Sequence, residues 1–535
     1  MLYNLNWLQQ GKPFPPNREK DRILRYRQNA ALFDGDHFVT SSYRYRNGTP
    51  ETVLSVYEQC ARRISRVIGN FEDVISFPVL INYQRLMTMK IADLICGEPP
   101  TVSGTTPEEN KLLKEIRDYT KFDEKLYTAV IDISRYGDAV LRIYKDDFDR
   151  VTFTCWDPTE WFPIVSQDGT NTIIKHCLCW IENVAEDDDS VPDYRLHVQI
   201  HDVLKPGTYE HRVYKMDTHC GIIGKQLKKE TKTVLTGLKS CAVCSLKSFS
   251  VSNTVYGYDD YMPIDSILSE ILARIGQISV ILDKHADPNI TGPVSMLQVD
   301  PVTGEYRLKT GKFYAVSPGE EQPKYMVWEG QLGAAFKQLE FLINQLYIVS
   351  EMGSALLGDA ASGSQAVSGT AMRFKMAGPL AKARRVANSL SLPVRELFAT
   401  LSRGAAIDGE SDITEIEYKK ISVLWSDGLP DDPRENIEMA KLATGETKLM
   451  PLEEALMEYF NKSNEEALDW VDRLRAQAEE AAERLMKQQD DPNKPGPQNG
   501  TGVNPTKKGS TTGLQNPTGQ QNRNQDTNRS RQTAK

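Results

Sequence analysis

Two long helical patterns separated by a stretch of small residues constrain the fold of this sequence most. In the first pattern, residues 331–352, apolar side chains recur at three- and four-residue steps, which places them on one face of a helix. That face consists of Phe336, Leu339, Ile343, Leu346 and Val349. Residues 353–369 then hold mainly glycine, alanine and serine, with Asp359 as the single charge. Because such residues cannot form a rigid packed unit alone, the sequence predicts a mobile loop here.

The second helical pattern opens at Ser368, Gly369 and Thr370 and is strongly basic, with Glu396 as its one acid. Gly378 and Pro379 fall about ten residues into it, where a proline removes a backbone hydrogen bond and clashes with the preceding turn. A long helix with a kink at these two residues is therefore expected. Its cations are Arg373, Lys375, Lys382, Arg384, Arg385, Arg395 and Arg403.

The order of these elements resembles the portal proteins of tailed bacteriophages, of the siphophage type. The resemblance rests on the helix, the small-residue loop and the run SGTAMRFKMAGPLAKARR at 368–385. It implies that the loop lines a central DNA tunnel. Arg373 and Lys375 lie one turn inside the following helix and are therefore the candidates for contacts with DNA phosphates. Pairing of these two cations with acids of a neighbouring subunit is the alternative. The implied tunnel-loop residues are Gly353, Ser354, Gly358, Ser362, Gly363, Ser364 and Gln365.

The remaining periodicity predicts an α+β chain. Helices are expected at 16–33, 82–96 and 110–136, and a strand at 139–144. Period-two patterns predict strands at 161–165, 172–180, 194–202 and 209–215, and a turn at 166–170 joins the first two as a hairpin. A helix at 262–285 carries an apolar stripe from Ile264 to Leu282. Short strands up to 328, a strand at 418–425 and helices at 434–444, 451–461 and 464–489 complete the pattern.

In the terms of the portal fold, the resemblance implies a wing, a stem of two long antiparallel helices, a clip, a long kinked helix and a helical crown, assembled as a ring. The wing is expected at 1–257, with a helical part followed by a β-rich part. The stem helices are expected at 258–285 and 331–352, the clip at 286–330, the tunnel loop at 353–369, the kinked helix and return strand at 370–430, and the crown at 431–489. Residues 490–535 are polar apart from Leu514, which predicts a disordered tail.

Composition limits the class of protein. The formal net charge of −9 and the pI near 5.5 argue against a general nucleic-acid coat, although a local basic stripe can exist in an acidic protein. No run of about eighteen apolar residues is present, and the first residues lack the features of a signal peptide, which predicts a soluble, unsecreted protein. The eight scattered cysteines fit a reducing cytoplasm.

The sequence contains no GxxxxGK[ST], HExxH or GxSxG motif and no GxGxxG after a strand, so neither catalysis nor a cofactor nor a metal is expected. Three alternatives stay open. One is another structural component of the head–tail connection or baseplate. A second is a metal-dependent hydrolase built on His197, His201, Asp202 and the acids at 187–189. The third is a zinc site, since Cys241 and Cys244 have CxxC spacing and further ligands exist in His176, Cys177, Cys179, His219 and Cys220.

The resemblance also implies partners and a location. Copies of the chain would form a ring of about twelve subunits by head-to-tail contacts. Double-stranded DNA would occupy the channel, and the terminase large subunit, a head–tail adaptor protein, and the scaffolding and major capsid proteins would dock on the ring; no membrane is involved. The ring would serve genome packaging, retention and ejection at the portal vertex of the virion, after assembly in the host cytoplasm.

Overall fold

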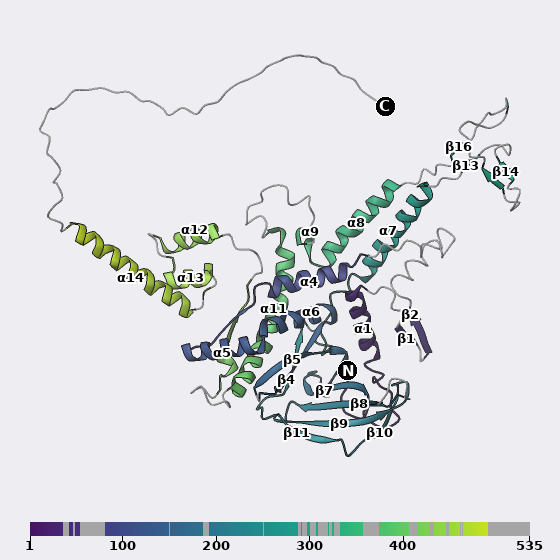
Figure 1. Ribbon diagram of the computed structural model, residues 1–535, viewed down its shortest axis with the longest axis horizontal. Helices are drawn as coiled ribbons and strands as arrows, with labels where there is room; N and C mark the ends of the chain where they lie inside the picture. Colours follow the sequence, from purple (N-terminus) through teal and green to yellow (C-terminus); the bar gives the residue numbers. More distant parts are fainter. Residues whose placement is uncertain are drawn as a thin grey trace, which may run out of the picture. The chain divides into compact units, whose positions relative to one another are not determined.

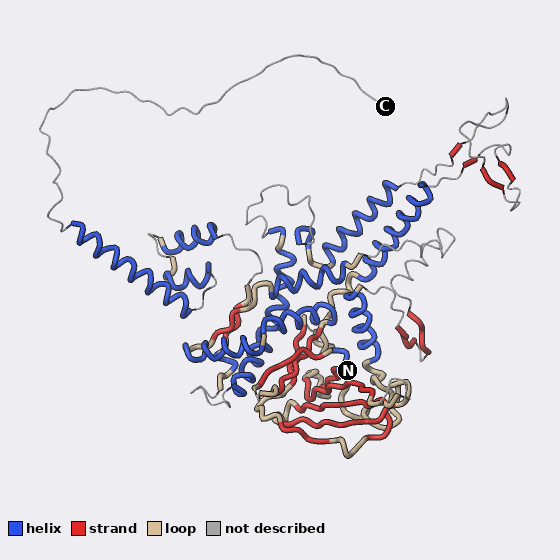
Figure 2. Tube along the Cα trace, in the orientation of Figure 1, coloured by secondary structure: helices blue, strands red, loops and turns tan. Residues whose placement is uncertain are grey.

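A computed structural model describes residues 1–35, 42–46, 49–53, 81–148, 150–185, 192–249, 251–286, 290–291, 297–299, 306–308, 319, 324–325, 332–356, 374–405, 415–426, 433–445, 449–460, 462 and 464–489. Helices and strands both build this structure (Figures 1 and 2), which confirms the α+β class. The ring and the assignment of portal subdomains stay predictions. The chain forms two compact units, Met1–Asp469 and Trp470–Lys535, and each is described by itself.

Among the described residues, the first part of the chain contains the helices α1 (Lys20–Asp34), α4 (Tyr83–Cys96), α5 (Pro107–Thr120) and α6 (Phe122–Tyr136). Their ends follow from local chemistry. The Asn82 side chain accepts a hydrogen bond from the backbone N–H of Arg85 and caps α4. Thr106 and Glu109 form a capping box at the start of α5. The two helices predicted within 110–136 are therefore confirmed.

The buried face of α4 includes a polar residue. Leu86 is 38 % exposed, whereas Met87 and Thr88 are fully buried. The reason is that α4 packs against α1, α6 and α11, so its buried surface is wider than one apolar stripe.

The transition from α6 to β4 (Asp138–Lys145) depends on a glycine. Gly137 ends α6 with φ 86°, in the left-handed region. A Cβ at this position would lie 2.6 Å from the carbonyl carbon of Gly257, so no larger residue fits without a shift of the backbone. The predicted strand after this glycine is confirmed. Strands β12 (Val243–Lys247), β4 and β5 (Val151–Trp156) form an antiparallel sheet in that order.

A second, six-stranded antiparallel sheet has the order β10-β9-β8-β7-β6, with β11 also paired to β9. Trp161 lies opposite Leu178 in the β6–β7 pair, which confirms the predicted hairpin. The short helix η1 (Pro158–Glu160) precedes this sheet. The strands are β6 (Trp161–Val165), β7 (Ile173–Asn183), β8 (Tyr194–Asp202), β9 (Thr208–Met216), β10 (Ile223–Gln226) and β11 (Lys232–Leu235). Strands β1 (Ser42–Arg46) and β2 (Thr49–Val53) form a separate hairpin.

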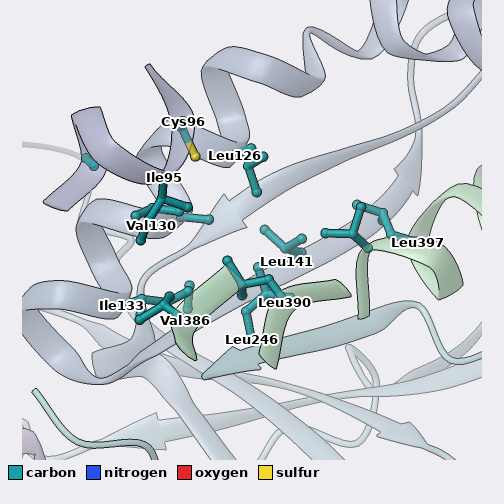
Figure 3. Packing of buried hydrophobic residues seen from close by; sticks show 14 of the residues in the cluster. Ile95, Cys96, Leu126, Val130, Ile133, Leu141, Leu246, Val386, Leu390 and Leu397 are labelled. Carbon is teal, nitrogen blue, oxygen red and sulfur yellow. The ribbon is translucent and has the colours of Figure 1, made fainter. Parts of the chain in front are cut away.

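The main hydrophobic core joins the first helices to the long helix α11 (Ala377–Ala405). Figure 3 shows that side chains from helices and strands far apart in the sequence meet at one place. This core therefore holds α11 on the N-terminal helices and on the three-stranded sheet. The labelled residues come from α4 (Ile95, Cys96), α6 (Leu126, Val130, Ile133), β4 (Leu141), β12 (Leu246) and α11 (Val386, Leu390, Leu397).

Two long helices, α7 (Asp265–Ala286) and α8 (Leu332–Val349), pack side by side, as Figure 1 shows. Between them the described residues form two small antiparallel pairs. The predicted stripe of α7 buries Ile264 and Ile271 completely, but Leu282 at its far end is 51 % exposed. The paired strands are β13 (Ile290–Thr291) with β16 (Lys324–Tyr325), and β14 (Leu297–Val299) with β15 (Tyr306–Leu308).

After α11 the chain returns to its N-terminal part. The expected strand 418–425 divides into the short helix η5 (Tyr418–Lys420) and strand β17 (Ser422–Leu424), which pairs with β3 (Thr101–Ser103). The three helices predicted between 434 and 489 are confirmed as α12 (Pro433–Thr444), α13 (Leu452–Phe460) and α14 (Asn464–Gln489). The predicted tail, 490–535, lies outside the described residues.

Candidate nucleic-acid interface

The end of α8 is shaped by two residues with left-handed backbone. Glu351 has φ 60° and Gly353 has φ 64°. Residues Gly353–Leu356 then form the single helical turn α9, so Gly353 and Ser354, predicted in the loop, belong to a short helix. The other predicted tunnel-loop residues, from Gly358 to Gln365, lie outside the described part of the chain.

The end of α8 and the start of α11 lie close together. A Cβ on Gly353 would lie 3.6 Å from the carbonyl oxygen of Lys375 and 3.8 Å from the ring of Pro379. A Cβ on Gly378 would lie 3.5 Å from the carbonyl oxygen of Glu351. The chain therefore leaves α8 and returns to α11 at one point, and we call the residues that meet there, 350–353 and 375–385, the loop base.

The predicted opening of the second helical pattern, 368–370, lies outside the described residues. Phe374 and Lys375 are helical, Met376 lies in a turn, and α11 begins at Ala377. Pro379 therefore occupies the first turn of α11, where a missing N–H costs no intrahelical bond, and the proline inside the helix is Pro393. The predicted kink at Gly378 and Pro379 stays a prediction.

Among the predicted phosphate contacts, Arg373 lies outside the described residues, while Lys375 is exposed at the loop base. Within the chain, cations of α11 form ion pairs. Lys382 pairs with Asp260, Arg385 pairs with Glu351, and Arg403 pairs with Glu415. Hydrogen bonds from Lys239 and Arg403 lower the pKa of Glu415. The basic stripe is therefore partly neutralised by acids of the same subunit, which sequence reasoning did not identify.

One signal in the sequence could have identified Lys382. Counting in helical steps of four, Lys382 precedes Val386, Leu390 and Val394, all of which are buried. A lysine in line with an apolar stripe predicts a buried, paired cation rather than a DNA contact.

The hydrolase residues are not brought together. His197 and His201 share one face of β8, whereas Asp202 lies on the opposite face and pairs with Lys175. The Nδ1 atom of His197 lies 3.2 Å from Nε2 of His211, and the buried His201 lies near Gln199. The acids at 187–189 lie outside the described residues.

The proposed zinc ligands are also poorly suited. Burial raises the pKa of the Cys177 and Cys244 thiols to about 12, whereas zinc binds the thiolate. Within the described part of the chain, no group of three or more His, Cys, Asp or Glu side chains could hold a metal ion. In the same part, no helix is both long and apolar enough to span a bilayer.

The described residues thus form an α+β chain in which the end of α8 and the start of α11 meet at the loop base. Residues 79–196 match the family model described as "Phage portal protein, SPP1 Gp6-like". This match confirms the resemblance to tailed-phage portal proteins and supports a portal role in the virion; it fits a structural rather than a catalytic protein. Among curated proteins no match was found.

The matched residues and the loop base are different segments. The match covers α4, α5, α6, β4 to β7 and the start of β8, whereas the resemblance drawn from the sequence rested mainly on 353–385. The loop base therefore lies outside the residues that the family model matches.

Proposed function

We propose that this chain is the subunit of a phage portal, a closed ring of about twelve copies around a DNA channel. The observation that carries the proposal is the pairing of the family match at 79–196 with a loop base that holds a returning segment between two long helices. The ring would let the genome enter the capsid, retain it and release it.

The outer surface of α8 supports assembly into a ring. Phe341 and Ile348 lie seven residues apart and so share one face of the helix, and they are 60 % and 67 % exposed. An exposed apolar face on a long helix is a contact surface for another chain. In a closed ring this surface would meet a different surface of the next copy, as head-to-tail symmetry requires.

Passage of DNA requires weak contacts. Each phosphate that a cation neutralises adds affinity and salt dependence, so many fixed contacts would hold the DNA in place. The internal pairing of Lys382, Arg385 and Arg403 reduces the number of cations available to phosphates. Lys375 and Arg373 are the cations that we propose to contact DNA, and residues 353–369 the segment that faces it.

The proposed ring would also dock other proteins. We propose that the terminase large subunit supplies the ATP-driven motor, since the chain has no phosphate-binding motif. A head–tail adaptor, the scaffolding protein and the major capsid protein would be further partners at the capsid vertex, with assembly in the host cytoplasm.

Negative-stain images of the purified chain, combined with light scattering, test the proposal. We expect rings with a central channel and a mass many times the 60.3 kDa of one chain. Prolines introduced by Ala361→Pro and Ser364→Pro should leave the rings intact and reduce DNA packaging or retention, because 358–365 contain no large apolar side chain. A single-chain mass at micromolar concentration would contradict the ring. Wild-type packaging by the proline variant would contradict the tunnel loop.

A further inference from the structure

Lys382 is the buried cation of the loop base. Its side chain is 10 % exposed, although it lies in the second turn of α11, close to the proposed DNA-facing segment. A lysine side chain in such a place needs a charge partner and hydrogen-bond acceptors, since burial of an unpaired ammonium is costly.

Asp260 supplies the charge partner, and the backbone of Ser350 supplies a hydrogen-bond acceptor. The Nζ atom of Lys382 lies 2.8 Å from Oδ1 of Asp260, which precedes α7. The same Nζ donates a hydrogen bond of 3.0 Å to the carbonyl oxygen of Ser350, just after α8. One ammonium thus connects the start of α11 to the end of α8 and to the chain before α7.

Asp260 is itself held in place. Its Oδ2 accepts a hydrogen bond of 2.7 Å from the hydroxyl of Ser134 on α6, and its backbone N–H donates to the carbonyl oxygen of Ser134. The Ser134 hydroxyl lies 3.1 Å from the hydroxyl of Thr88 on α4, which lies 2.8 Å from that of Tyr261. The acceptor for Lys382 is therefore fixed to the helices of the main core.

The second ion pair of the loop base is different. Arg385 donates to both carboxylate oxygens of Glu351 at 2.8 Å, but the two side chains are 44 % and 45 % exposed. Exposed pairs contribute little because water and salt screen them. The buried contact of Lys382 is therefore the stronger of the two connections.

We propose that Lys382 is a positioning residue for the DNA-facing segment: its ammonium fixes both ends of that segment to Asp260. The loop base then moves only with the core, while the residues between its two ends are not constrained by this contact. The inference about DNA rests on the proposed portal function, whereas the inference about the loop base does not.

The test measures hydrogen exchange on the full chain without DNA. In Lys382→Met, which keeps the apolar stem, the amides of Ser350 and Leu380 should exchange about tenfold faster or more, because Asp260 loses its partner. These amides are bonded to Leu346 and Met376 in the wild-type structure. Asp260→Asn should give the same result. The control Arg384→Gln removes one exposed charge from the same helix and should leave exchange unchanged.

Wild-type exchange in both Lys382→Met and Asp260→Asn would overturn the proposal. If Lys382→Met unfolds throughout, the double variant Lys382→Met with Asp260→Asn removes the uncompensated charge. That variant should fold and still show fast exchange at the Ser350 amide, because the carbonyl oxygen of Ser350 has lost its hydrogen-bond donor. Slow exchange at this amide would also overturn the proposal.

A second readout separates this inference from the portal function. DNA packaging or retention should fall in Lys382→Met and stay at the wild-type level in Arg384→Gln. Fast exchange together with unchanged packaging would uphold the positioning of the loop base and contradict its role at a DNA channel.

Discussion

The six-stranded sheet and the α7–α8 hairpin bury their apolar side chains to different degrees. On one face of the sheet, Cys177 and Val198 pack with Leu2 from the N-terminal segment, and all three are 5 % exposed or less. On the other face, Trp161 and Leu178 pack with β4 and β12. On the hairpin, by contrast, large apolar residues are exposed at both helices, namely Leu282, Phe336, Phe341 and Ile348.

The sheet thus buries its core within one chain, whereas the hairpin leaves apolar side chains exposed that a second chain could cover. The sheet packs on both faces against other segments of the same chain, so its core is a property of the single subunit. On the hairpin, Leu268 and Leu346 are buried in the main core, whereas Leu282 and Phe341 stay exposed. Substitutions in the two regions should therefore change different measurements.

The largest effect is expected from Phe341→Glu. A charge at the centre of the exposed apolar face should prevent contact with a second copy, so the ring should dissociate to species of lower mass. Thermal unfolding of the single subunit should change little, because Phe341 is 60 % exposed. Light scattering and thermal unfolding measure the two effects.

The matched control for Phe341→Glu is Gln338→Glu, which adds the same charge at an exposed polar position of α8. It should retain most of the ring. Equal ring mass in wild type and Phe341→Glu would show that the hairpin face is not a subunit contact, and the comparison between sheet and hairpin would lose its functional meaning.

The sequence predicted most elements whose signals are local. The hairpin of β6 and β7 follows from period-two patterning around a turn, and α5 and α6 follow from the helical pattern within 110–136. The pairing of β17 with β3 and the contact of Lys382 with Asp260 join residues far apart in the sequence, so local patterns could not predict them. Of the candidate site, the sequence identified the helices and the returning segment but not the internal pairing of the cations.

A medium effect is expected from His201→Gln in the sheet. Burial lowers the pKa of His201 to about 3, while an unfolded histidine has a pKa of about 6.5. Between these values the unfolded chain binds more protons than the folded chain, so the free energy of unfolding falls as the pH falls. At pH 5 this single residue should account for about 2 kcal/mol of the loss, which the substitution removes.

The measurement is the difference in free energy of unfolding between pH 7 and pH 5, in wild type and variant. A loss of packing that is equal at both pH values cancels in this difference. Burial also raises the pKa of Asp138 to about 6, which acts in the opposite direction, but Asp138 is the same in both proteins. His219→Gln, at an exposed position, is the control. An unchanged pH dependence in His201→Gln would show that His201 does not titrate as a buried group.

The smallest effect is expected from Glu351→Gly at the loop base. Glu351 has φ 60°, a conformation that costs a residue with a side chain about 1–2 kcal/mol and costs glycine nothing comparable. The exposed pair with Arg385 contributes about 0.2–1 kcal/mol, and glycine adds about 0.4–1 kcal/mol of entropy to the unfolded chain. These terms nearly cancel, so the free energy of unfolding should stay within about 1 kcal/mol of wild type.

Urea unfolding at 150 mM salt, taken as roughly physiological, measures this free energy, with Arg385→Met as the variant that removes the ion pair alone. A loss of more than about 2 kcal/mol in either variant would exceed what an exposed ion pair supplies. In that case Arg385 would anchor the end of α8 as firmly as Lys382 does, and the distinction between a buried and an exposed connection at the loop base would not hold.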